Sequence, residues 1–148
     1  MPSAHTVRFY RAQLSSADES ERCGRAAFAV RHLSAMRLLI TATGDVDATN
    51  ARALGRFIER QTGVPKQLVL DLSDVEFFGT EGFAALHYVS VHCARHDVGW
   101  LFVGGPTVRR IVGICDPDAE LPLAHDLAAA LAHLDHLERC GHLVQSAG

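Results

Sequence analysis

The sequence predicts an α/β domain in which a central mixed β-sheet is flanked by about four α-helices. Short apolar runs that fit buried strands alternate with amphipathic segments that fit helices. A chain of 148 residues has the usual length of one domain, and no internal repeat divides it. We therefore expect residues 25–139 to form a single domain, with a flexible arm at 1–24 and a frayed tail at 140–148.

The domain is expected to begin with a β-hairpin. Residues 15–21, SSADESE, form a polar run without apolar periodicity, which is typical of a linker or a mobile arm. The runs at 27–30 (AFAV) and 36–41 (MRLLIT) are strand-like and are separated by a short connection. Two such runs so close together predict an antiparallel hairpin.

An amphipathic helix is expected after Gly44, which interrupts the apolar run before it. Asp47, Thr49 and Asn50 are candidate caps, because their side-chain oxygens can accept hydrogen bonds from the first helix amides. The apolar face of this helix consists of Ala51, Leu54, Phe57 and Ile58. The glycine and proline of the sequence GVP at 63–65 are residue types that commonly follow helix ends.

A buried strand and a second helix follow. Residues 67–72, QLVLDL, form an almost continuous apolar run, which is typical of a parallel strand covered on both faces. The sequence GTEG at 79–82 then begins a helix, with the Thr80 hydroxyl as its expected cap and Glu81 near the positive end of its dipole. We expect the Cys93 thiol to be buried and reduced, because it shares the inner face of this helix. That face is expected to contain Phe83, Leu86, Val89 and Cys93.

The last third of the chain continues the alternation. Residues 99–103 (GWLFV) predict another buried strand, and residues 107–112 (TVRRIV) predict a short helix. A short extended segment is expected at 121–123 (LPL). The final helix is rich in alanine, and its apolar stripe is expected to consist of Leu127, Leu131, Leu134 and Leu137.

Charge and cysteine content argue against several classes of function. The net charge is -3, and Lys66 is the one lysine among 14 basic residues, so the sequence has neither a basic nucleic-acid stripe nor a polybasic membrane patch. The four cysteines form no CxxC pair, and no apolar run reaches the roughly 18 residues of a membrane span. We therefore expect a cytoplasmic protein with reduced thiols, without nucleic acid as a partner and without direct membrane insertion.

The residue pattern favours neither catalysis nor metal binding. The pairs His92–His96 and His133–His136 each lie on one helix face, but neither has an acidic or cysteine residue placed as a third ligand. We expect exposed histidines, no metal and no cofactor. Thr80 does not stand in a nucleophile-elbow motif, and the turn GGPT at 104–107 lacks the spacing of a phosphate-binding loop. The sequence thus predicts a protein that is not an enzyme.

The turn around Thr80 has two interpretations. A hydroxyl at a helix start can cap the helix, which explains the residue structurally. The same hydroxyl can accept a phosphoryl group, whose charge of about -1.5 to -2 would lie at the positive end of the helix dipole. The residues alone permit a phosphorylation switch and do not distinguish it from a helix cap.

Three segments carry a family resemblance. Residues 44–54 read GDVDATNARAL and are similar to the pattern G-E-L-D-x-x-T-A-x-x-L. Residues 68–83, LVLDLSDVEFFGTEGF, are similar to V-L-D-L-S-x-V-x-F-x-D-S-S-G-L, and residues 104–112, GGPTVRRIV, to G-x-x-x-x-V-x-R-x-L. With these motifs in this order, the chain resembles the STAS domain of anti-sigma factor antagonists over about residues 26–138.

The resemblance implies a STAS-like domain that has no enzyme activity and binds another protein. Members of this family bind an anti-sigma factor with a serine kinase fold and so release a sigma factor. Phosphorylation of a hydroxyl at the start of the second helix blocks that binding, and a phosphatase restores it; the hydroxyl corresponds to Thr80 here. Partner contacts are expected at Asp45, Asp47, Thr49, Phe78, Gly79, Thr80, Glu81 and Gly82.

Two residues depart from the family pattern. Gly79 stands where the family has aspartate, and Glu81 stands where it has serine or threonine. Glu81 puts a permanent negative charge beside Thr80 and would mimic part of the phosphorylated state. The alternative is therefore a STAS subunit without a phosphorylation switch that joins a larger assembly, such as a lipid transporter or a stress-signalling scaffold.

Overall fold

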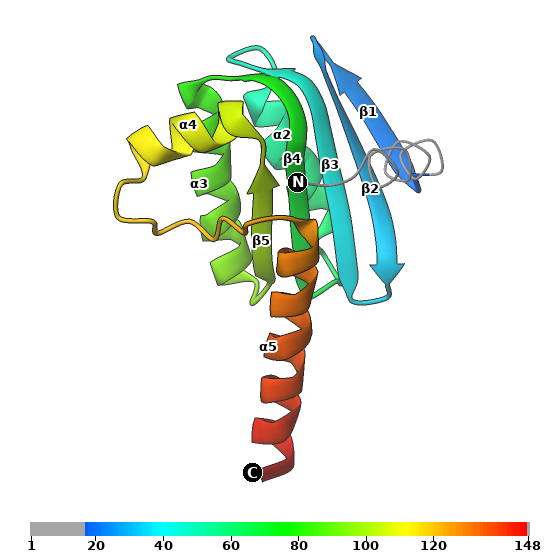
Figure 1. Ribbon diagram of the computed structural model, residues 1–148. Helices are drawn as coiled ribbons and strands as arrows, with labels where there is room; N and C mark the ends of the chain where they lie inside the picture. Colours follow the sequence, from blue (N-terminus) through cyan, green and yellow to red (C-terminus); the bar gives the residue numbers. More distant parts are fainter. Residues whose placement is uncertain (1–16, 148) are drawn as a thin grey trace.

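A five-stranded mixed β-sheet forms the centre of the computed structural model, which describes residues 17–147, with side chains up to residue 140 (Figure 1). In sheet order, the strands are β1 (Glu19–Cys23), β2 (Ala26–Ser34), β3 (Arg37–Val46), β4 (Gln67–Phe78) and β5 (Gly99–Gly104). β1, β2 and β3 are antiparallel neighbours, whereas β3, β4 and β5 run parallel. The described helices are α2 (Ala51–Gln61), α3 (Thr80–Arg95), α4 (Pro106–Cys115) and α5 (Leu127–Ala147). The predicted hairpin and the mixed sheet with four flanking helices are confirmed.

β1 corrects the expected start of the domain. The sequence pattern assigns residues 19–23 to the flexible arm, but they pair antiparallel with β2. β1 lies at the edge of the sheet with mostly exposed side chains, so it needs no apolar periodicity, and backbone hydrogen bonds hold it. Gly24, with a φ of 58°, allows the tight turn into β2. Residues 1–16 of the expected arm lie outside the described residues.

β4 is longer than the predicted strand because bulges carry it on to Phe78. The register between β3 and β4 shifts twice, and each shift inserts one extra residue of β4. Strict alternation along β4 would turn Asp74 and Glu76 toward the core. The first bulge turns Val75 inward in place of Asp74, the second returns Phe78 to the core face, and both carboxylates are exposed.

The C-terminal third differs from expectation in three places. Residues 121–123 make one bridge, between Leu123 and Phe102 of β5, since Pro122 has no amide hydrogen to extend the pairing. α5 is helical to Ala147, whereas a frayed tail is expected from residue 140; a helix forms its backbone hydrogen bonds without a neighbouring element. Leu137, expected in the buried stripe, is 45% exposed because α5 extends past the end of the sheet (Figure 1).

Apolar side chains form one packed layer on each face of the sheet. On the face covered by α2, α3 and α4, the four largest fully buried side chains are Phe28, Phe57, Phe78 and Phe102. On the opposite face, α5 covers β4 and β5, and its buried Leu134 packs in one cluster with Leu39, Val69 and Leu101 of the strands. β4 is therefore covered on both faces, as its apolar run predicts. The predicted apolar face of α2 is also buried.

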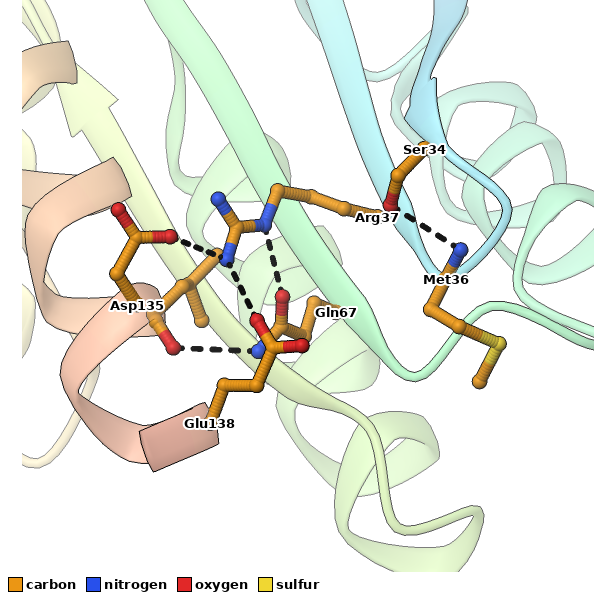
Figure 2. A network of polar contacts seen from close by, with 7 residues as sticks. Ser34, Met36, Arg37, Gln67, Asp135 and Glu138 are labelled. Carbon is orange, nitrogen blue, oxygen red and sulfur yellow. Dashed lines mark hydrogen bonds and ion pairs between the residues drawn. The ribbon is translucent and has the colours of Figure 1, made fainter. Parts of the chain in front are cut away.

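A polar network joins α5 to the start of the parallel strands (Figure 2). The Arg37 guanidinium donates from Nε to Oε1 of Gln67 at 2.7 Å, and its Nη2 lies 2.8 Å from Asp135 and 3.6 Å from Glu138. Gln67 in turn donates from Nε2 to the carbonyl oxygen of Leu134 at 3.2 Å. The arginine side chain is 14% exposed, so water screens these bonds less than it screens an ordinary surface pair. The network fixes α5 across β3 and β4.

Candidate functional site

The turn from β4 into α3 exposes the side chain of Thr80 at the first residue of the helix. Gly79 precedes the helix with an extended backbone, and its carbonyl oxygen accepts hydrogen bonds from the amides of Gly82 at 3.0 Å and Phe83 at 3.3 Å. The Gly79 amide donates to the carbonyl oxygen of Val46, at the end of β3, at 3.1 Å. The prediction that Thr80 caps α3 is therefore wrong, because Gly79 holds the cap position and no described side chain caps this helix. The Thr80 hydroxyl is left at the surface.

Two glycines of this turn are packed closely by neighbouring side chains. A Cβ atom on Gly82 would lie 2.6 Å from Cε1 of the buried Phe78 ring, so the ring lies directly against the helix backbone. A Cβ atom on Gly79 would lie 2.6 Å from Oε2 of Glu81, so the carboxylate folds back over this glycine. The permanent negative charge beside Thr80 therefore lies against the turn itself, at the positive end of the α3 dipole.

The loop after β3 lies at the same edge as the Thr80 turn, because β3 and β4 are parallel neighbours that end side by side. Asp47 accepts hydrogen bonds from the hydroxyl and the amide of Thr49, and these bonds lower the pKa of Asp47. Asp45, near the end of β3, is in register with Phe77 of β4. The structure thus places the predicted contact residues of both loops at one edge of the sheet.

Asn50 organises the loop after β3. It is fully buried, and its Nδ2 donates to the carbonyl oxygens of Asp45 at 2.8 Å and Cys23 at 3.2 Å. Its Oδ1 accepts from the amide of Asp47 at 3.0 Å. Sequence reasoning identifies Asn50 as a candidate cap from its place before the helix, but its side chain makes no cap hydrogen bond to α2. It connects the loop to β1 instead, which no local pattern indicates.

The β1–β2 turn also belongs to this edge, and sequence reasoning misses it. The carbonyl oxygen of Arg25 accepts a hydrogen bond from the amide of Asp45 at 3.1 Å. A Cβ atom on Gly24 would lie 3.1 Å from Oγ1 of Thr49, so the two loops touch. The positive charge of Arg25 also contributes, after the Thr49 hydrogen bonds, to the lowered pKa of Asp47. The polar composition of this segment resembles a linker, and only the strand pairing brings it here.

Of the two adjacent phenylalanines, Phe77 is the one at the surface. Phe78, a predicted contact residue, is 1% exposed and supports Gly82 from below. Phe77 is 52% exposed, and its Cε1 would lie 3.5 Å from a Cβ atom on Gly79. Aromatic side chains are enriched in the cores of protein interfaces. The side chain available for contact beside Thr80 is therefore that of Phe77.

A sequence model of the STAS domain matches residues 27–130, a range that includes the Thr80 turn and the loop after β3. The chain belongs to the STAS domain family. This STAS domain is similar to the crystal structure of an anti-sigma factor antagonist from Mycobacterium paratuberculosis, with 28% sequence identity and a TM-score of 0.63. That match covers 73% of this chain and 92% of the other.

Two further proteins are similar to the STAS domain. Osmosensory protein A of Mycobacterium tuberculosis is 28% identical over a 118-residue alignment, and the match covers 76% of this chain and 75% of that protein. The anti-sigma factor antagonist SpoIIAA in its unphosphorylated form matches with a TM-score of 0.59 over 75% of this chain and 96% of its own. Its sequence identity is 12%, so this likeness concerns the fold.

Two other reactive side chains of the STAS domain, those of His92 and Cys93, lie toward the C-terminal end of α3, away from Thr80. Cys93 is buried as predicted, and burial raises the pKa of its thiol to about 12. His92, expected to be exposed, is partly buried: its ring shares a hydrogen bond with Oγ1 of Thr62 at 2.8 Å, and burial lowers its pKa. Within residues 17–140, no three His, Cys, Asp or Glu side chains are grouped as metal ligands. None of the described helices has the length and apolar character of a membrane span.

Proposed function

We propose that this protein is an anti-sigma factor antagonist. It binds an anti-sigma factor with a serine kinase fold and thereby releases a sigma factor, so that it regulates transcription in the cytoplasm without enzyme activity of its own. The likeness to the Mycobacterium paratuberculosis antagonist supports this role. The observation that carries the proposal is the exposed Thr80 hydroxyl at the start of α3, at an edge that two neighbouring loops complete.

The proposed contact surface combines an exposed aromatic ring with polar groups held in place. Phe77 supplies apolar area at its centre, while Thr80 and Glu81 lie beside it on α3. Asp47 and Thr49 border it from the neighbouring loop, which the buried Asn50 side chain fixes through three hydrogen bonds. A loop that is already ordered loses little conformational freedom when a partner binds.

Phosphorylation of Thr80 would change the charge of this surface with little change of fold. Thr80 is exposed, and its side chain holds no cap hydrogen bond that a phosphoryl group would break. The added charge of about -1.5 to -2 would lie beside the Glu81 carboxylate. The helix dipole offsets part of this charge, but a partner that fits the neutral hydroxyl is repelled. Removal of the group by a phosphatase would restore binding.

Glu81 keeps part of this negative charge in place permanently. Because its carboxylate lies over Gly79, it occupies space beside the acceptor hydroxyl rather than extending into solvent. We infer that Glu81 lowers affinity for the anti-sigma factor in the unmodified protein. Replacing it with serine should therefore strengthen binding.

The test begins with the full chain, used to capture its partner from the source cell, and continues with titrations of that purified partner. Thr80→Asp should weaken binding, Thr80→Ala should keep it and abolish phosphorylation, and Glu81→Ser should strengthen it. Ala132→Asp adds the same charge at an exposed position of α5, across the sheet, and should bind like the parent. If all three site variants bind like the parent protein, the proposed switch is wrong.

One observation favours the alternative of a STAS subunit without a switch. Gly79 and Glu81 together replace the family pattern on both sides of Thr80, and the Glu81 carboxylate lies against the backbone of Gly79. In that case the partner is a larger assembly, and the Thr80 variants bind it with the affinity of the parent protein. Capture of a transporter or a signalling scaffold, in place of a kinase-fold anti-sigma factor, would support this alternative.

A further inference from the structure

The outward face of α3 carries an apolar stripe that begins one turn after Thr80. The stripe follows helical spacing of four, three and three residues, so its members lie on one side of the helix. Tyr88 is 48% exposed and Val91 is 39% exposed, while the opposite side of α3 packs into the core. We call this surface the α3 stripe; it consists of Ala84, Tyr88, Val91 and Ala94.

Tyr88 is held in a fixed position at the centre of the α3 stripe. Its hydroxyl donates to Oε2 of Glu59 on α2 at 2.7 Å. A Cβ atom on Gly55 would lie 3.3 Å from Cδ1 of the ring, so the ring lies across the close approach of α2 and α3. An aromatic side chain ordered in this way before binding loses little rotamer freedom when a partner covers it.

The surroundings of Tyr88 are positively charged, although the whole chain carries a net charge of -3. The hydrogen bond to Glu59 raises the pKa of Tyr88, while the positive charges of Arg56 and Arg95 act in the opposite direction. Both arginines are exposed, and neither forms an ion pair with another residue in the described part of the chain. Arg52 lies one turn before Arg56 on α2 and is exposed as well. Glu59 is the one carboxylate whose charge acts on the pKa of Tyr88, and it already accepts the tyrosine hydroxyl.

We propose that the α3 stripe docks an acidic amphipathic helix of the anti-sigma factor, a statement that rests on the function proposed above. The apolar side of that helix covers Tyr88 and Val91, and its carboxylates pair with Arg56 and Arg95. From residue 84 to residue 94 the stripe spans about 15 Å, roughly three turns of a helix laid alongside. Tyrosine and arginine are the residue types that most often dominate binding energy, and unpaired arginines favour a partner of opposite charge.

The test uses the full chain and the anti-sigma factor captured with it, titrated at low and at high salt. Tyr88→Ala should weaken binding by about tenfold or more. Tyr88→Phe keeps the ring and should stay within about threefold of the parent. Arg56→Glu combined with Arg95→Glu should weaken binding by about a hundredfold, most strongly at low salt. Arg139→Glu, the same change at an exposed position of α5, should leave affinity unaltered.

Hydrogen exchange of the anti-sigma factor locates the docked segment. The parent chain should protect a helix rich in Asp and Glu, and Tyr88→Ala should remove that protection while circular dichroism confirms an unchanged fold. If the stripe variants bind like the parent while Thr80→Asp still weakens binding, the docking inference is wrong and the proposed function stands. Protection of a basic segment overturns the inference too. If no anti-sigma factor binds the parent chain, the proposed function fails and the inference fails with it.

Discussion

Replacing Gly82 with alanine tests the packing beneath Thr80. Within a helix this change usually stabilises a protein by about 0.5–1 kcal/mol, because glycine loses more backbone entropy on folding. At Gly82 the new Cβ atom would lie 2.6, 2.7 and 2.8 Å from three carbon atoms of the Phe78 ring. Phe78 is 1% exposed and close-packed, so it cannot move aside without disturbing the core. Overpacking of this kind costs about 1–3 kcal/mol, and we expect a net loss of about 0.5–2 kcal/mol in the free energy of unfolding.

Gly113→Ala is the matched control. Gly113 is exposed in α4, and no atom lies within 4 Å of its Cβ position, so this variant should gain about 0.5–1 kcal/mol. Urea denaturation measures both changes, and the thermal midpoint should move by about 2–4 °C for each kcal/mol. In a Phe78→Leu background, Gly82→Ala should cost less, because the ring atoms it meets are gone. An equal stabilisation by Gly82→Ala and Gly113→Ala would refute this account of the turn.

Three further predictions concern buried polar or reactive groups. Asn50→Ala should lower the free energy of unfolding by about 2–4 kcal/mol, because three hydrogen bonds of the loop after β3 lose their partner. Urea denaturation measures this change, and a loss below about 1 kcal/mol, roughly the value of one ordinary hydrogen bond, would contradict this role of Asn50. Burial raises the pKa of Asp71, outweighing the hydrogen bonds from Ser73, so the charged form is disfavoured in the folded state. The parent should therefore lose stability relative to the Asp71→Asn variant as the pH rises from 3.8 through the raised pKa of Asp71. A difference in unfolding free energy between the two proteins that does not change with pH would contradict this prediction. Cys93, with its pKa raised to about 12, should react with a thiol reagent far more slowly than the exposed Cys140, and equal rates in the native protein would argue against its burial.

Most of the central sheet and its helices could be predicted from short stretches of sequence. The run QLVLDL at 67–72 predicts a strand covered on both faces, and the structure places α3 and α4 on one side of it and α5 on the other. The four residues of the predicted apolar face of α2 repeat with helical spacing, and all four are buried. Such patterns are readable because a strand or helix that packs against a core repeats its apolar residues with its own period.

The candidate site depended more on tertiary contacts. The motif at 79–82 indicates a helix start with an exposed hydroxyl, but two bulges in the pairing with β3 decide that Val75 faces the core in place of Asp74 and Glu76. Packing at this edge likewise decides that Gly79 holds the cap position of α3 and that the Glu81 carboxylate lies over Gly79.

The sequence by itself determined which segments become the central strands and helices, and that Thr80 stands at a helix start. The tertiary structure decided that residues 19–23 form an edge strand and that their turn joins the site. It also decided that the Asn50 side chain forms hydrogen bonds to β1, to β3 and to the loop after β3, and that Arg37 of β3 pairs with Asp135 of α5. The reason is physical: periodicity and capping act over a few neighbouring residues, whereas an edge strand held by backbone hydrogen bonds leaves no side-chain pattern. A buried polar side chain, in turn, takes the partners that strands distant in the sequence bring to it.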